Sequence, residues 1–152
     1  MAGYSTTPLA RKLGVREDQT VAILGAPEGW AIEGLPGGVR VRRRLGPDAA
    51  LILAFFPQRA KLRRRLPALV ARVPPDGCLW VAWPRRAAGH HSDISENDLR
   101  ELILPTGLVD VKVAALDEDW SGLKFVWRRK LRSRPPNGYP HRGSPPDHGP
   151  SV

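Results

Sequence analysis

The stretch LWVAWPRRAAGHHSD, residues 79–93, joins an unbroken apolar run to a loop of charged and polar residues. From Cys78 to Trp83 no side chain is charged, which is typical of a short strand covered on both faces of a sheet. Pro84 follows the run, and two arginines and two histidines come after it. We therefore expect a buried strand whose carboxyl end opens into a polar segment.

Other segments predict further strands around this one. Apolar runs at 20–24 and 50–56 have the length and composition of buried strands. The segment VRVRRRL, residues 39–45, predicts an edge strand with its arginines facing outward. Near the end of the chain, we expect a strand over residues 108–116, a turn over 117–122 and a returning strand over 123–130.

Three helices are expected between these strands. The first lies within residues 6–15 and ends at Gly14. The second, residues 57–73, is amphipathic, and Pro67 is expected to kink it or to begin another helix. The third begins at Ser95, with an acidic residue three positions later as in a capping box.

This alternation of strands and helices predicts the class of the fold. Strands that alternate with helices form a parallel sheet through right-handed crossovers. The strand, turn and strand at the end of the chain add an antiparallel hairpin. The sequence therefore predicts a small Rossmann-like α/β sandwich of three layers, with a mostly parallel sheet that ends in the hairpin.

Charge and composition divide the 152-residue chain into two parts. The formal net charge is +9, and residues 128–152 hold six Arg or Lys side chains against one Asp. Because the segment 131–152 is rich in Pro and Gly and has no apolar periodicity, we expect a disordered basic tail. Residues 1–130 are expected to form a single domain.

Cysteine content and hydropathy indicate the compartment. The single cysteine, Cys78, excludes an internal disulfide and a Cys-based zinc site within one chain. No apolar run approaches the roughly 20 residues of a membrane helix, and no signal-peptide core is visible. We expect a cytoplasmic protein without a membrane partner.

The predicted sheet also indicates where a site would lie. Ligands of open α/β folds bind at the carboxyl ends of the strands. The residues that follow the predicted strands there, and that we take as candidate ligand-binding residues, are Glu28, Trp30, Arg85, Arg86, Asp117, Glu118 and Trp120.

We expect Arg85 and Arg86 to lie near the turn that holds Asp117, with at least one Arg–carboxylate pair. The alternative for the same residues is a solvated loop that binds nothing. The neighbouring histidines, His90 and His91, point in different directions because they are adjacent, and they predict no metal site.

The turn after the first predicted strand departs from a nucleotide-binding loop. In LGAPEGW, residues 24–30, Gly25 and Gly29 lie four apart, and Pro27 between them lacks an N–H and stiffens the turn. No P-loop, metalloprotease motif or nucleophile elbow occurs. We expect no cofactor, neither S-adenosylmethionine nor NAD, and no catalytic motif is visible.

Residues 3–130 resemble a bacterial family known as domain of unknown function 3052. The two most specific stretches are SDISEND, residues 92–98, and LPTGLVDVKVAALDEDWSGLKFVWRR, residues 104–129. The family usually has two lysines where Arg85 and Arg86 stand, and the two histidines depart from its pattern. The segment VPPDGCLWVAW, residues 73–83, with the helix and hairpin after it, is also remotely similar to the second half of a Rossmann-like methyltransferase. These resemblances imply a fold and no established activity.

The function that these observations favour is binding or regulation, through an unidentified anionic ligand or protein partner. Two alternatives stay open. One is a divergent methyltransferase-like enzyme. The other is a nucleic-acid-binding protein that uses the basic helix 58–72 and the basic tail, an alternative that rests on charge alone.

Overall fold

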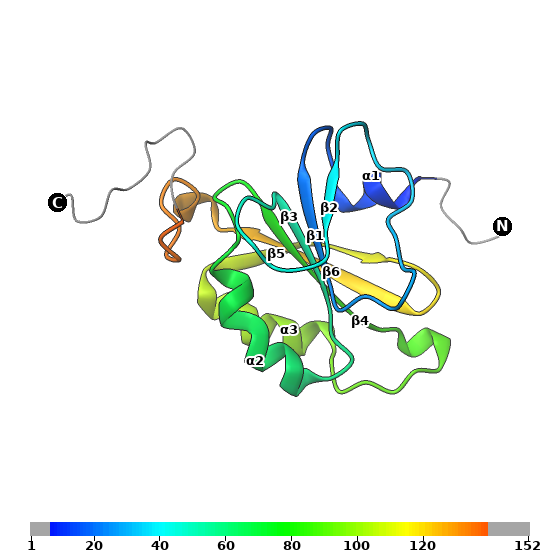
Figure 1. Ribbon diagram of the computed structural model, residues 1–152. Coiled ribbons are helices and arrows are strands. Elements are labelled where there is room, and N and C mark those ends of the chain that lie inside the picture. Colours follow the sequence, from blue (N-terminus) through cyan, green and yellow to red (C-terminus); the bar gives the residue numbers. More distant parts are fainter. Residues whose placement is uncertain (1–6, 140–152) are drawn as a thin grey trace.

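A six-stranded sheet forms the centre of the computed structural model, which describes residues 7–139 (Figure 1). Its strands are β1 (Thr20–Leu24), β2 (Arg40–Arg42), β3 (Leu51–Phe55), β4 (Cys78–Pro84), β5 (Leu108–Ala115) and β6 (Trp120–Trp127). Their order across the sheet is β2-β1-β3-β4-β6-β5. The three apolar runs are buried strands as predicted, and β2 is an edge strand as its arginines indicated.

The strand directions match the predicted fold class. β1 is parallel to β2 and to β3, and β3 is parallel to β4. β6 is antiparallel to both of its neighbours, β4 and β5. It follows that β5 has the same direction as β4, so the carboxyl ends of β1 to β5 all lie at one rim of the sheet.

Helices cover the two faces of the sheet unequally. Of the helices α1 (Leu9–Leu13), α2 (Arg59–Val70) and α3 (Glu96–Ile103), the last two lie on one face and the short α1 lies on the other (Figure 1). Three short 3-10 turns complete the elements: η1 (Arg86–Ala88), η2 (Leu104–Thr106) and η3 (Arg129–Leu131). The fold is the three-layer α/β sandwich that the sequence predicted.

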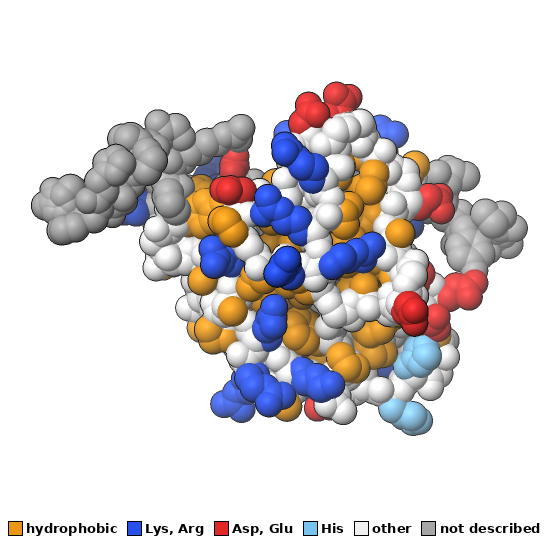
Figure 2. Space-filling model, in the orientation of Figure 1, with side chains coloured by type: hydrophobic (Ala, Val, Ile, Leu, Met, Phe, Trp, Pro, Cys, Tyr) orange, Lys and Arg blue, Asp and Glu red, His pale blue; other side chains and the backbone are white. Residues whose placement is uncertain are grey.

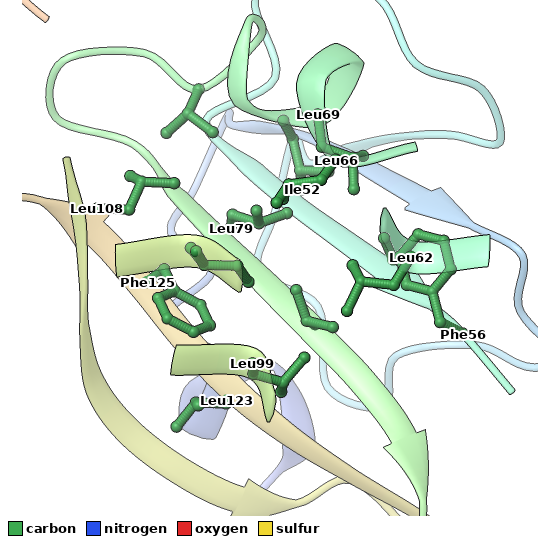
Figure 3. Close-up of a cluster of buried hydrophobic side chains, with 14 of the residues drawn as sticks. Ile52, Phe56, Leu62, Leu66, Leu69, Leu79, Leu99, Leu108, Leu123 and Phe125 are labelled. Carbon is green, nitrogen blue, oxygen red and sulfur yellow. The ribbon is translucent and has the colours of Figure 1, made fainter. Parts of the chain in front are cut away.

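Two apolar clusters, one on each face, hold these layers together. Under α2 and α3, Leu62, Leu66 and Leu99 pack with Ile52 and Phe125 of the sheet (Figure 3). Removing one such fully buried leucine side chain typically costs about 2–5 kcal/mol of stability.

On the opposite face, Leu13 and Trp80 are fully buried, and the indole N–H of Trp80 donates to the carbonyl oxygen of Leu13 at 3.0 Å. This bond fixes the short helix α1 to the middle of the sheet. Gly14 ends α1 in the left-handed conformation, with φ of +87°, as its position in the sequence predicted.

Of the two expectations for Pro67, a second helix that begins there is wrong. Pro67 lies inside α2, which continues without a break to Val70. Pro67 is exposed, so the carbonyl of Arg63, which loses its N–H donor, lies on the solvent side. Leu66 and Leu69, on the opposite side, are buried in one cluster and keep the last turn in register with the rest of the helix.

The boundaries of the terminal hairpin also differ from the prediction. We expected residues 117–122 to form the turn, but β6 already begins at Trp120, and Ser121 and Gly122 pair with Trp83 and Ala82 of β4. A segment rich in turn residues becomes a strand here because β4 supplies its backbone partners. At Gly122 a Cβ would meet Leu116 and Trp80 at 3.0–3.1 Å, so a larger residue would not fit there without movement.

Residues 131–139, which we assigned to the disordered tail, instead contact the domain. The Asn137 side-chain amide donates to the carbonyl of Val70, the last residue of α2, at 2.8 Å and to that of Val73, just after the helix, at 3.1 Å. The Tyr139 hydroxyl accepts from the backbone N–H of Asp48 at 3.2 Å. The rest of the predicted tail, 140–152, lies outside the described residues. Over residues 7–139, no helix is long and apolar enough to cross a membrane.

Candidate functional site

The turn between β5 and β6 lies beside the end of β4, as the sequence predicted. The backbone N–H of Arg85 donates to the carbonyl of Asp119 at 2.8 Å. The guanidinium of Arg85 donates to the carbonyls of Asp117 at 3.1 Å and Glu118 at 3.4 Å. We had expected Arg85 to pair with a carboxylate, but its guanidinium donates to backbone carbonyls instead. The side chain of Arg85 therefore acts as a clamp that holds the backbone of the turn against the end of β4.

Arg86 does not share this role. Its side chain is exposed. The hydrogen bond from the Ser95 hydroxyl is the main cause that lowers the pKa of Asp98, at the start of α3, and the charges of Arg59 and then Arg86 act in the same direction. The carboxylate that pairs near the clamp belongs to Asp119, and its partner is His90, with Nε2 and Oδ1 2.8 Å apart. Adjacent Arg85 and Arg86 thus belong to two different clusters.

Three aromatic rings and one carboxylate form the inner part of the rim. Phe55 lies between Trp30 and Trp120, with ring centroids 4.7 Å and 5.0 Å apart in T-shaped pairs. The Trp30 indole N–H donates to Oδ2 of Asp117 at 2.9 Å. Oδ1 of Asp117 accepts from the backbone N–H groups of Asp119 and Trp120, both at 2.8 Å. All of these groups are engaged in holding the loops together.

The structure therefore brings together most of the residues that the sequence singled out. Trp30, Arg85, Asp117 and Trp120 are joined by the contacts above, and the Glu118 carbonyl completes the clamp. Glu28 is exposed and has no hydrogen bond or ion pair with another described residue. Phe55, which links the two tryptophans, was not predicted, because in the sequence it is one more residue of a buried strand.

A pocket lies at the same rim, at the point where the strand order reverses. The chain leaves β1 toward β2 on one side and leaves β3 toward β4 on the other, so the reversal lies between β1 and β3. Open α/β sheets bind ligands at such a position. The pocket has a volume of about 220 Å³ and is lined by Leu24, Gly25, Arg43, Arg44, Phe55, Phe56 and Arg65.

Three arginines give this pocket its charge. Arg43 and Arg44 follow β2, and Arg65 belongs to α2. All three are exposed, and none has a hydrogen-bond or ion-pair partner among residues 7–139. A guanidinium presents several N–H donors in a planar fork that matches phosphate and carboxylate groups. The arrangement therefore suits an anion.

These arginines were missed as site residues, although they are conspicuous in the sequence. The run RVRRRL suggested only an outward-facing edge strand, and Arg65 suggested the polar side of a helix. Their convergence depends on how the β2–β3 connection passes α2, which no local pattern encodes. The one local indication was their position: Arg43 and Arg44 follow directly on the carboxyl end of a strand beside β1.

The glycine after β1 has a structural explanation. Gly25 has φ of +69°, and a Cβ at this position would lie 2.9 Å from the carbonyl oxygen of Phe55. A glycine is therefore needed for the close approach of the β1 and β3 ends. The carbonyl oxygen of Pro27 accepts a hydrogen bond from the backbone N–H of Trp30 at 3.0 Å, which closes the turn after Gly25.

Cys78 is unsuited to nucleophilic chemistry. Burial raises the pKa of its thiol to about 11, although the charge of Lys124 acts in the opposite direction. At neutral pH the thiol is therefore protonated, and the thiolate is the reactive form. Among the described residues, no three His, Cys, Asp or Glu side chains are grouped so as to hold a metal ion.

Comparison with known proteins supports the fold. A TehB-like SAM-dependent methyltransferase from Corynebacterium glutamicum aligns with a TM-score of 0.54 and 12% identity, over 84% of this chain and 91% of its own. Magnesium protoporphyrin IX methyltransferase from Synechocystis PCC 6803 aligns with a TM-score of 0.49 and 10% identity, over 79% of this chain and 74% of its own. No family model and no curated protein matches the chain. At this identity the first structure shows a shared fold alone, and the second likeness carries no argument.

Proposed function

We propose that this chain is a non-catalytic binding protein that holds a small anion in the arginine-lined pocket at the β1–β3 reversal. The observation that carries the proposal is the convergence of Arg43, Arg44 and Arg65 on one pocket without an acidic partner among residues 7–139. Unpaired arginines around a concave surface are typical of sites for phosphate or carboxylate groups.

The size of the pocket limits the ligand. A volume of about 220 Å³ is below the roughly 300–1,000 Å³ of pockets that enclose a drug-sized molecule. The pocket floor is formed by Phe55 and Phe56, which are 3% and 8% exposed and offer little area for stacking. The proposed ligand is therefore an inorganic or small organic phosphate, or a small carboxylate. A whole dinucleotide is too large for this pocket and is not proposed.

A divergent methyltransferase-like enzyme is the alternative. Its support is the likeness in fold to a SAM-dependent methyltransferase at 12% identity. Against it, Gly25 is explained by backbone packing on Phe55, and Pro27 replaces the flexible part of a Gly-rich turn. We do not assign S-adenosylmethionine to the pocket for this reason.

We also propose a family and a cellular location for this chain. We place it in the bacterial family of domain of unknown function 3052, on the strength of residues 92–98 and 104–129 in the sequence. A cytoplasmic location is proposed from the use of a single, buried cysteine.

Calorimetry and thermal melting of the full chain test the anion site. Inorganic phosphate and pyrophosphate should bind, raise the melting temperature and bind more weakly as salt increases. The triple variant Arg43→Ala, Arg44→Ala, Arg65→Ala should weaken this binding by about tenfold or more, because it removes the donors of charge-assisted hydrogen bonds. S-adenosylmethionine and NAD serve as comparison ligands.

The matched control removes the same charge elsewhere. Arg11, Arg16 and Arg129 are exposed and lie outside the pocket, so the triple alanine variant at these positions should bind phosphate as the original chain does. Equal weakening in both triple variants, or no binding of either anion, would overturn the proposal. Saturable S-adenosylmethionine binding tighter than phosphate binding would favour the methyltransferase-like alternative.

A further inference from the structure

Helix α2 carries a second set of basic residues outside the pocket. Lys61, Arg63 and Arg64 are exposed, and none has a hydrogen-bond or ion-pair partner in the part of the chain that the structure describes. The buried side of the same helix is formed by Leu62, Leu66 and Leu69. Since these leucines fix the rotation of the helix, the three cations are held on the outer face of the sandwich.

The edge strand β2 extends this charge on the same face of the sheet. Arg42 is in register with Ala22, which belongs to the apolar cluster under α2. Neighbours in register point to the same side of a sheet, so Arg40 and Arg42 lie on the side that α2 covers. Figure 2 shows Lys and Arg side chains in a band across this face, over β2 and α2; the histidines and several acidic side chains lie to the right, and other acidic side chains lie at the top and on the left. We call Arg40, Arg42, Lys61, Arg63 and Arg64 the basic face.

Two hollows flank the exposed side of α2. One is the arginine-lined pocket already described, on the side of β2. The other has a volume of about 540 Å³ and is lined by Arg59, Ala60, Arg63, Arg64 and Asp93. Arg59 is paired with Asp98 at 2.9 Å, so Arg63 and Arg64 are the unpaired cations of this second hollow. Unpaired positive charge thus extends across both sides of the helix.

A surface of this kind fits a polyanion better than a single small ion. Spaced cations that contact successive phosphates gain affinity by releasing condensed counterions, whatever the sequence of the nucleic acid. Proteins that hold single strands combine such a surface with aromatic side chains that stack on bases. Here the phenylalanines nearest the basic residues, Phe55 and Phe56, are buried. Charge without exposed rings favours a duplex, which presents closely spaced phosphates and keeps its bases stacked.

We propose that the basic face binds the phosphate backbone of a nucleic-acid duplex without reading its sequence. This inference goes beyond the small-anion site, because it rests on residues other than the three arginines that define that pocket. The outer residues of α2 contact the backbone, and Arg40 and Arg42 extend the contact along the edge of the sheet.

Fluorescence anisotropy with the full chain tests the proposal. Short DNA duplexes of two unrelated sequences should bind with similar affinity and with a linear fall of log affinity with log salt. The variant Lys61→Ala, Arg63→Ala, Arg64→Ala should bind at least about tenfold more weakly, and the salt slope should shrink by about 0.9 for each phosphate that the variant no longer neutralises.

The control removes three charges at the end of the domain. Arg128, Arg129 and Lys130 are exposed and distant in sequence from α2, and their triple alanine variant should retain duplex binding. Equal or greater weakening in this control would overturn the proposal, because binding would then follow total charge or the end of the chain. Inorganic phosphate binding by the α2 variant should be unchanged, which separates this test from that of the pocket.

Other ligands decide between classes of polyanion. A single strand of the same length, polyglutamate and phosphatidylglycerol vesicles should each bind more weakly than the duplex at the same salt concentration. Tighter binding of any of these, a large difference between the two duplex sequences, or no duplex binding at low salt would each overturn the proposal.

Discussion

The indole of Trp30 donates a hydrogen bond to the carboxylate of Asp117 at 2.9 Å, although 87 positions of sequence separate the two residues. The bond connects the loop after β1 to the turn between β5 and β6. Both segments follow strands of one direction, and the three strands between them bring their ends to one rim. Because of this bond, we expect a substitution of Asp117 in the turn to change the surroundings of Trp30 in the loop after β1.

Replacing Asp117 with alanine should destabilise the fold and expose Trp30. The change removes the indole bond and the two bonds from the N–H groups of Asp119 and Trp120. Because Asp117 is exposed, water replaces part of these bonds, and we expect a cost of about 1–2 kcal/mol. Urea unfolding gives the cost, and a red shift of tryptophan fluorescence reports the exposure. The control is Glu28→Ala, at an exposed residue without a described partner, which should change neither the free energy of unfolding nor the tryptophan fluorescence.

Single substitutions should separate the roles of Arg85 and Arg86. Arg85→Ala removes the donors to two turn carbonyls and should lower stability by about 1 kcal/mol. Arg86→Ala removes an exposed side chain and should change stability by less than about 0.5 kcal/mol. Phosphate affinity should stay unchanged in both variants. Its loss in the double variant, with the fold intact, would instead place the anion site at these two arginines, as the sequence had suggested.

The contact of residue 137 with the end of α2 should make a measurable contribution to stability. Asn137→Ala removes two hydrogen bonds to the carbonyls of Val70 and Val73 and should cost about 1 kcal/mol. In a domain of this size, that cost lowers the melting temperature by about 2–8 °C. Ser133→Ala, at an exposed residue in the same segment, is the control.

Truncations test what is left of the tail prediction. A chain that ends at Lys130 should melt lower than the full chain, because the hydrogen bonds of Asn137 and Tyr139 are gone. A chain that ends at Tyr139 should have the same melting temperature as the full chain. The opposite result for the first truncation would restore the boundary at Lys130 that we expected from composition.

The capping box of α3 should make part of the stability depend on acid. The hydrogen bond from the Ser95 hydroxyl lowers the pKa of Asp98 below its ordinary value. A carboxylate whose pKa is lower in the folded chain stabilises the fold above its ordinary pKa, and this stability is lost as the pH falls through the lowered value. Ser95→Ala should therefore cost about 1 kcal/mol near neutral pH.

The difference between the original chain and Ser95→Ala should begin to shrink as the pH falls below the ordinary Asp pKa of about 4. It should continue to shrink until the pH passes the lowered pKa of Asp98 in the folded original chain. Urea unfolding at about pH 7 and about pH 3 measures this difference. Ser95→Thr keeps the hydroxyl and should behave like the original chain. A difference that is the same at both pH values would show that the carboxylate of Asp98 takes no part in the cap.

Local patterns predicted those parts of the fold whose causes are local. The apolar runs that became β1, β3 and β4, the cap at Ser95 and the stop at Gly14 each depend on neighbouring residues, and the structure confirms them. The start of β6 at Trp120 could not be predicted, because its backbone partners lie on β4, nearly 40 positions earlier.

In the candidate site, too, only part of the arrangement could be predicted from the sequence. The rim could be located from strand directions, and Trp30, Arg85, Asp117 and Trp120 were found there. What these residues do could not be predicted, because a side chain that clamps a turn and one that awaits a ligand have the same identity in the sequence. The pocket arginines Arg43, Arg44 and Arg65 come from two elements whose packing is a property of the whole fold.

The position of β6 between β4 and β5 has a consequence for synthesis of the protein. Until Trp120–Trp127 has left the ribosome, β5 has no strand to pair with, and the edge of β4 is open. An open edge next to buried strands is prone to pairing with other chains. A nascent chain that stalls before Trp120 therefore exposes β4, the longest of the buried apolar strands, and is the species on which a chaperone would act.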